Sequence, residues 1–185
     1  MIITIDPLNP SSYANAAREL RIYAKEIERK TEFLHQLILL KLSQDVDNGF
    51  RSAVYDDIFK VKAKKGGDTP AMGYRTPQVE VRISHGRDFS VIIAEGKEAI
   101  FVEFGAGVYH NGSGSPHPKG ATFGWTIGSY GKHNGLKQEW AFFPEGDRSN
   151  GTGFTHGTPA QMPMYSALER VVAEIETMAK EVFRT

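Results

Sequence analysis

Two stretches decide the fold: Phe101-Val102-Glu103-Phe104-Gly105-Ala106-Gly107 and Thr155-His156-Gly157-Thr158-Pro159-Ala160-Gln161-Met162-Pro163-Met164-Tyr165. The first is a half-apolar segment that glycines stop, and the second is a Gly/Pro corner that leads into a helical pattern. A proline in the first turn of a helix costs little, because its missing amide would have no partner there. We therefore expect the chain to turn after Phe104 and a helix to begin at or near Pro163.

Length and composition limit the class of protein. The chain has 185 residues, 22 basic and 22 acidic side chains, and no cysteine. This length predicts one domain over residues 1–185. The lack of cysteine excludes a thiolate zinc site, a thiol nucleophile and a disulfide framework. Zero net charge argues against a protein that grips nucleic acid mainly through its phosphates. Neither a signal peptide nor a run of apolar residues long enough to span a membrane is visible, so we expect a soluble protein.

Two segments have the apolar spacing of helices. In the first, apolar residues recur at helical spacing from residue 13 to residue 42, and no glycine or proline follows until Gly49. Pro10-Ser11-Ser12 predicts its start, with a serine as the capping residue. So long a helix exceeds the width of a compact domain. Either it breaks near Lys30-Thr31, or one end projects and packs against another subunit, which we favour. The second amphipathic segment runs from residue 165 to the C-terminus.

The strands are predicted from residues that alternate in polarity. Residues 79–83 and 89–94 alternate on either side of His85-Gly86-Arg87-Asp88, which predicts a hairpin. Residues 140–144 and 154–156 predict a further strand and its return. The expected fold class is therefore α+β: a long N-terminal helix, an antiparallel sheet formed by a meander plus a hairpin, and a C-terminal helix packed on the sheet.

Other segments leave alternatives open. Residues 51–63 fit either a helical face or a strand, and residues 99–104 fit either a third strand or a short helix. We expect residues 64–77 to form a loop. Residues 105–138 form a glycine-rich insertion that carries aromatic residues such as Tyr109 and Trp125. This composition is typical of adaptable contact surfaces, so the insertion contacts a neighbouring subunit or partner, is disordered, or packs on its own domain as a flap.

Histidines are the first candidates for chemistry, because His110, His117, His133 and His156 lie in or beside the glycine-rich region. A zinc site needs three or four ligands at suitable offsets, and these spacings match no such pattern. We therefore interpret these residues as solvated loop histidines, with His156 hydrogen-bonded to its own corner.

Glu103 is the second candidate, since it lies among apolar residues. Burial would raise the pKa of its carboxyl group and suit a general base. The same carboxylate could instead accept hydrogen bonds from backbone amides, or pair with an arginine, and so anchor the segment. We favour the anchoring role, because the flanking glycines allow backbones to approach closely.

Together with Asn48-Gly49-Phe50-Arg51-Ser52, the two opening phrases resemble the tail-completion or head–tail joining (minor tail, neck) proteins of long-tailed bacteriophages and prophages. That family carries a VEFG phrase followed by a G-T-P-A corner and a last helix, and a Gly-hydrophobic-Arg-x-Ser link after its first helix. The resemblance favours a short helix at residues 99–104. The sequence departs from the family in its much longer connection over residues 105–153, and in Met162-Pro163-Met164, where a Pro-Phe pair is common.

The resemblance implies a structural virion protein and no enzyme. Such a protein would be made in the host bacterial cytoplasm and would act as a ring, with a hexamer the usual expectation, between the head connector and the tail-tube proteins. DNA would pass only as cargo, and neither a membrane nor a cofactor would take part. The expected interface or structural residues are Gly49, Arg51, Glu103, Phe104, Gly105, Tyr109, Trp125, His156, Gly157, Pro159 and Pro163. The alternative is a metal-dependent hydrolase that uses Glu103 with His110, His117 or His156.

Overall fold

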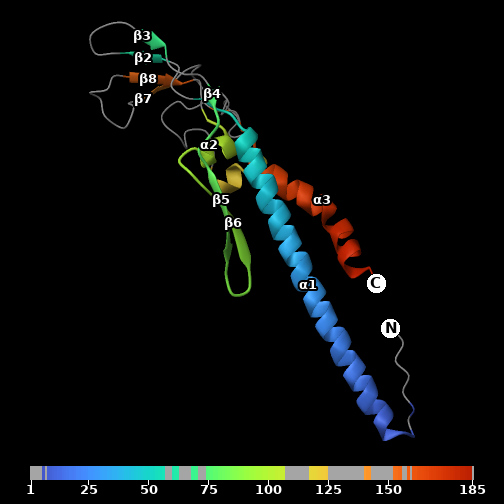
Figure 1. Ribbon diagram of the computed structural model, residues 1–185. Coiled ribbons are helices and arrows are strands. Elements are labelled where there is room, and N and C mark those ends of the chain that lie inside the picture. Colours follow the sequence, from blue (N-terminus) through green and yellow to red (C-terminus); the bar gives the residue numbers. More distant parts are fainter. Residues whose placement is uncertain are drawn as a thin grey trace. The chain divides into compact units, whose positions relative to one another are not determined.

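The fold is α+β, as the sequence predicted, with a long N-terminal helix, antiparallel strands and a C-terminal helix (Figure 1). The structure is a computed structural model that describes residues 6, 8–56, 60–62, 68–70, 74–106, 117–124, 140–142, 152–155, 158 and 160–184. Its contacts divide the chain into two compact units, Met1–Lys41 with Val171–Thr185, and Leu42–Arg170. The single domain expected from the length stays a prediction beside this division.

Helix α1 (Pro10–Ser52) begins earlier than the serine caps predicted. Its capping residue is Asn9, whose Oδ1 accepts the amide of Ser11 at 3.1 Å. Asparagine is as good an N-cap as serine, and proline is favoured as the first helical residue, so Asn9-Pro10 is the stronger start signal. The serine prediction was therefore wrong. The hydroxyl of Ser12 instead accepts the amide of Asp6 at 2.7 Å.

Helix α1 is continuous and does not break near Lys30-Thr31. No glycine or proline interrupts it between Pro10 and Gly49, so each turn can continue the last. It also runs through the phrase at residues 48–52, which we had expected to link the helix to the sheet. Gly49 is therefore a helical residue, and the chain leaves α1 only after Ser52.

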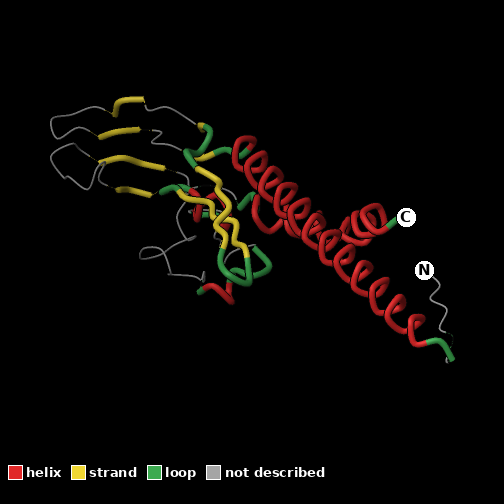
Figure 2. Tube along the Cα trace, turned by 60° about the horizontal axis from the view of Figure 1, so that its bottom comes forward, coloured by secondary structure: helices red, strands yellow, loops and turns green. Residues whose placement is uncertain are grey.

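The described strands form three antiparallel sheets instead of one (Figure 2). Strand β1 (Tyr55–Asp56) pairs with β4 (Tyr74–Arg75), and β5 (Glu80–His85) pairs with β6 (Ser90–Glu95) as the predicted hairpin. The third sheet has the order β3-β2-β8-β7. Its members are β2 (Lys60–Lys62), β3 (Asp68–Pro70), β7 (Trp140–Phe142) and β8 (Thr152–Thr155). Strands β7 and β8 confirm two predicted strands. Residues 64–77 were expected to be a loop but contain β3 and β4. These strands are too short to show an alternation of polar and apolar residues in the sequence.

The core of the unit Leu42–Arg170 lies where the end of α1 meets α2 (Ala99–Phe104) and the start of α3 (Pro163–Phe183). The short helix α2 agrees with the resemblance. Val46, Phe50, Ala53, Val102 and Ala167 are buried together. Partly buried side chains of the hairpin region pack against them: Val79, Val81, Ile92 and Ala94. Burial of an apolar side chain as large as Phe50 contributes roughly 1.5–3 kcal/mol, so this cluster fixes the three helices and the hairpin.

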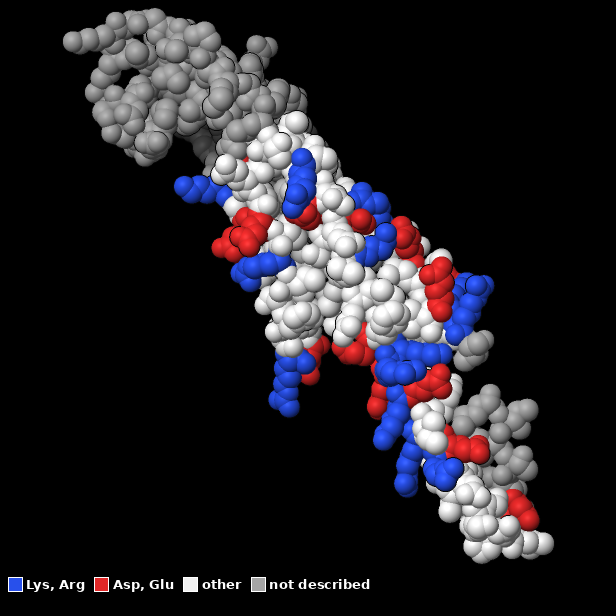
Figure 3. All heavy atoms as spheres, viewed as in Figure 1, with Lys and Arg blue, Asp and Glu red and all other residues white. Residues whose placement is uncertain are grey.

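The other unit consists of most of α1 and the last part of α3. Lys41 Nζ lies 3.1 Å from Glu174 Oε2. Farther along, Arg29, Lys30, Phe33 and Val182 line an open depression of about 280 Å³. On the face drawn in Figure 3, lysine and arginine side chains alternate with aspartate and glutamate side chains. No described helix combines the length and apolar content that crossing a bilayer requires.

Candidate functional site

Glu103 lies at the end of α2 and caps the start of α3. Its side chain is buried, and its two carboxylate oxygens accept the backbone amides of Met164 at 2.9 Å and Tyr165 at 3.0 Å. The first amides of a helix have no partner within the helix, and negative charge is favourable at that end. Glu103 therefore acts as the capping group of a helix that begins sixty positions later in the sequence.

His117 supplies the third hydrogen bond to this carboxylate. Its Nε2 lies 3.0 Å from Glu103 Oε1, and its Nδ1 accepts the amide of Lys119 at 3.0 Å. Because Nδ1 accepts a hydrogen, the ring proton is assigned to Nε2, and a neutral imidazole donates to Glu103. The side chain is only 2% exposed. The interpretation of His117 as a solvated loop histidine was therefore wrong.

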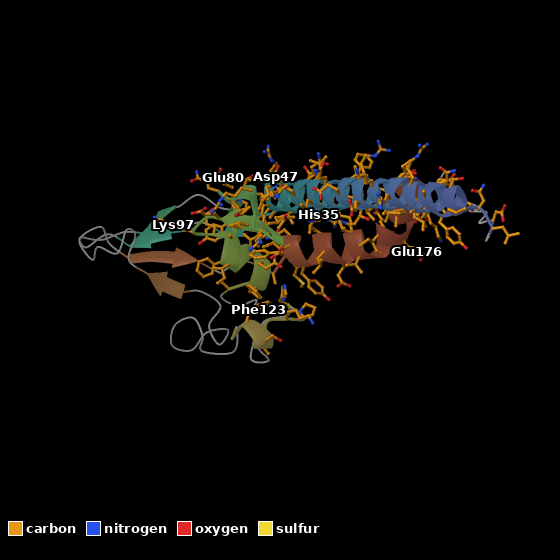
Figure 4. The ribbon with its side chains drawn as sticks, turned by 90° about the horizontal axis from the view of Figure 1, so that it is seen from below. His35, Asp47, Glu80, Lys97, Phe123 and Glu176 are labelled. Carbon is orange, nitrogen blue, oxygen red and sulfur yellow. The ribbon has the colours of Figure 1, made fainter. Side chains whose placement is uncertain are left out.

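Aromatic rings enclose the imidazole of His117. The ring of Phe104 lies 4.5 Å away, centroid to centroid, and the ring of Tyr165 lies 5.1 Å away. Phe104 also contacts Phe123, at 5.9 Å, on the short helix η2 (Ala121–Phe123) (Figure 4). These contacts exclude water from the Glu103–His117 hydrogen bond, which strengthens it.

Backbone hydrogen bonds hold the turn after α2 against the segment before α3. Gln161 N–H donates to Val102 O, and Ala106 N–H donates to Thr158 O, both at 2.8 Å. Between them Gly105 has φ 78°, and a Cβ built there would lie 3.0 Å from the amide nitrogen of Ala160. Both the dihedral angle and the space therefore require glycine at position 105.

The end of α1 joins the same place through Gln161 and Gly49. The side chain of Gln161 accepts the amide of Val54 at 2.8 Å and donates to the carbonyl of Val54 at 2.7 Å. A Cβ built on Gly49 would lie 2.8 Å from Pro163 Cβ. We call residues 49–54, 102–106, 117, 158 and 160–165 the junction. No local pattern marks Gln161, because its partner Val54 lies 107 positions away.

The predicted site residues divide into two groups. The described ones that pack together in the junction are Gly49, Glu103, Phe104, Gly105 and Pro163. Arg51 is also described, and its exposed side chain pairs with Asp47, one turn back on α1, at 2.6 Å. The other predicted site residues lie outside the described residues: Tyr109, Trp125, His156, Gly157 and Pro159. The candidate histidines His110 and His133 also lie outside them.

The geometry of the junction suits anchoring better than catalysis. Each carboxylate oxygen of Glu103 and each ring nitrogen of His117 has a hydrogen-bond partner within the chain. Among the residues that the structure describes, no group of three or more His, Cys, Asp or Glu side chains could hold a metal ion. Glu103 and His117 therefore hold together segments that are distant in sequence.

Comparison of the chain with models of protein families, with curated proteins and with solved structures finds no match. The function is therefore inferred from the geometry of the junction and from the resemblance of its residues.

Proposed function

We propose that the chain is a structural protein of a phage or prophage virion, a head–tail joining or tail-completion component. It acts through contacts with copies of itself and with head-connector and tail-tube proteins. It works as a ring, carries no cofactor and catalyses no reaction. Its place of action is the virion, after synthesis in the host bacterial cytoplasm, and DNA passes it only as cargo.

The observation that carries this proposal is that the three phrases of the resemblance meet at the junction. Gly49 contacts Pro163, Glu103 caps the helix that Pro163 begins, and Gly105 lies against Ala160. The three phrases lie far apart in the sequence, so one structural role, the formation of the junction, accounts for all three. A scaffold that presents surfaces to neighbouring subunits needs such a rigid junction and no reactive group.

Helix α1 supports the part of the proposal that concerns subunit contacts. Within the unit that holds most of α1, large apolar side chains on this helix remain exposed: Tyr13, Leu20, Ile22, Tyr23, Phe33 and Leu40. Exposed apolar side chains that recur along one element are typical of surfaces that bind other proteins.

A second candidate function, a metal-dependent hydrolase, is favoured by one observation, the 3.0 Å contact between Glu103 and His117. A buried carboxylate–histidine pair occurs at many catalytic and metal centres. Here both oxygens of the Glu103 carboxylate and the second ring nitrogen of His117 already accept hydrogen bonds from backbone amides. The structural proposal therefore accounts for more of the contacts.

Two measurements test the proposal. Light scattering should give the mass of a closed ring for the purified chain, alone or mixed with the connector and tail-tube proteins encoded beside it. A mass that stays monomeric in all of these mixtures would contradict the proposal. Equilibration with zinc or manganese, followed by metal analysis, tests the alternative. One-to-one binding that disappears in His117→Ala would favour the hydrolase.

A further inference from the structure

Among the described residues, nothing pairs with the edge of the β5–β6 hairpin that runs along β6. Gly86 N–H donates to Phe89 O at 2.8 Å, and hydrogen-bonded pairs alternate with non-hydrogen-bonded pairs in an antiparallel ladder. Val91 and Ile93 therefore exchange hydrogen bonds with β5, whereas Ser90, Ile92 and Ala94 direct their backbone groups away from it. In the part of the chain that the structure describes, no backbone hydrogen bond reaches these outward groups of β6.

The two edges of the hairpin differ in how well they are protected against pairing. The face turned away from the core carries Glu80, Arg82 and Ser84 on β5, and Arg82 pairs with Glu95 at 3.4 Å. On β6 the same face carries Val91 and Ile93, with Phe89 before them and Glu95 at the end of the strand. Charged residues at a strand edge discourage pairing with another chain, and apolar β-branched residues favour it. The β5 edge is therefore protected, and the β6 edge is open.

Two exposed apolar side chains mark the open edge. Phe89 is 65% exposed and Val91 is 43% exposed. Both lie on the face that does not contact the core, and the ring of Phe89 lies over Gly86 of its own hairpin. Such side chains beside an unpaired edge indicate that a further strand covers them.

We propose that β6 pairs with β6 of a second copy of this chain, antiparallel and about a two-fold axis at Val91. In this register Ser90 exchanges backbone hydrogen bonds with Ile92 of the other copy. Val91 then faces Val91, and Phe89 faces Ile93, at the closely spaced non-hydrogen-bonded positions. Pairs of aromatic and β-branched side chains across strands stabilise such pairings.

The two neighbouring registers are less favourable. If Ile92 stood opposite Ile92, Phe89 would face the carboxylate of Glu95. If Ser90 stood opposite Ser90, Ile93 would face Arg87. The proposed register instead places Phe89, Val91 and Ile93 all against apolar partners. The sequence Phe89-Ser90-Val91-Ile92-Ile93 is thus complementary to itself, which identifies a second copy as the occupant.

This inference does not rest on the virion role. A two-fold contact closes on itself and makes pairs, so a ring would require a different contact. The pairing surface is small, so association should depend on protein concentration.

Cysteine cross-linking tests the register, because the chain has no cysteine of its own. In Val91→Cys the two thiols would meet across the axis within disulfide distance, so mild oxidation should give a covalent dimer. Ser84→Cys is the matched control, since Ser84 stands opposite Val91 on the protected strand and should stay monomeric. A Val91→Cys variant that stays monomeric, or a control that cross-links equally well, would overturn the proposal.

Charge exchange at the same position tests the symmetry in solution. Sedimentation should show a dimer for the unchanged chain. Val91→Lys and Val91→Glu should each be monomeric, because like charges would face each other. An equal mixture of the two variants should regain the dimer. Dimers that persist in both single variants, a mixture that stays monomeric, or an unchanged chain that is monomeric at every concentration would each reject the pairing. Rings that persist in both variants would reject it while leaving the virion proposal intact.

Discussion

Gly49 on α1 lies directly against Pro163, the first residue of α3, so closely that a Cβ at position 49 would stand 2.8 Å from Pro163 Cβ. The neighbouring atoms belong to a rigid ring and its backbone, which cannot move aside easily. Glycine is a poor helix former, and its presence in α1 is explained by this contact.

Gly49→Ala is therefore expected to destabilise the protein. The added methyl group should cost about 1–3 kcal/mol in overpacking, against roughly 1 kcal/mol gained in helix propensity. Urea unfolding measures the difference. Asn48→Ala is the matched control, because Asn48 is exposed on the same turn and should be neutral or slightly stabilising. If both substitutions stabilise the protein equally, the contact with Pro163 does not exist in solution.

Glu103→Ala should lower the free energy of unfolding by about 2–3 kcal/mol, because it leaves the partly buried amides of Met164 and Tyr165 without an acceptor and removes the buried partner of His117. Glu103→Gln should lower it less, since one acceptor oxygen remains. Chemical denaturation compares both with Glu28→Ala, an exposed position on α1 that should change little. Equal stability of Glu103→Ala and the unchanged chain would disprove the capping role.

The ring of His117 should carry its proton on Nε2, because Nδ1 accepts the amide of Lys119. Nitrogen chemical shifts of a ¹⁵N-histidine-labelled sample distinguish the two neutral tautomers and the cation. The chain has 6 histidines, and His117→Gln identifies the signal by its loss. A charged ring, or a proton on Nδ1, would contradict the hydrogen bond from Lys119.

Gln161→Glu should be as destabilising as Gln161→Ala, or more so. The carboxylate keeps an acceptor for the amide of Val54 but places a second oxygen against the carbonyl of Val54, where the amide group donates at 2.7 Å. Each variant should lose about 0.5–1.5 kcal/mol in urea unfolding, because both hydrogen bonds lie near the surface. A Gln161→Glu protein as stable as the unchanged chain would show that the carbonyl of Val54 needs no donor.

The spacing of apolar residues correctly predicted the elements that have a regular spacing of their own. The alternation at residues 79–94 predicted β5 and β6, and helical spacing predicted both long helices. The start signal at Pro10 was predicted, but its capping residue was missed, because the serines were preferred over Asn9. Strands β3 and β4 were missed because each is so short that pairing, and not its own sequence, defines it.

The junction could be predicted only in part. Glycine on either side of Glu103 indicated a close approach of backbones, and the anchoring role followed from it. The partners of Glu103 were not predictable, since they are backbone amides that every residue except proline carries. The same limit applies to His117, whose burial depends on rings brought in by α2 and α3.

The hydrogen bonds of the junction also set an order of events during synthesis. Val54 pairs with Gln161, and Glu103 pairs with Tyr165. Neither hydrogen bond can form until the ribosome has released nearly all of the unit Leu42–Arg170. Helix α1 can form as it emerges, because its backbone hydrogen bonds are local, whereas closing such long loops is slow. A nascent chain that stops before position 163 would lack the amides of α3 that the carboxylate of Glu103 accepts, so this part of the unit could not be completed.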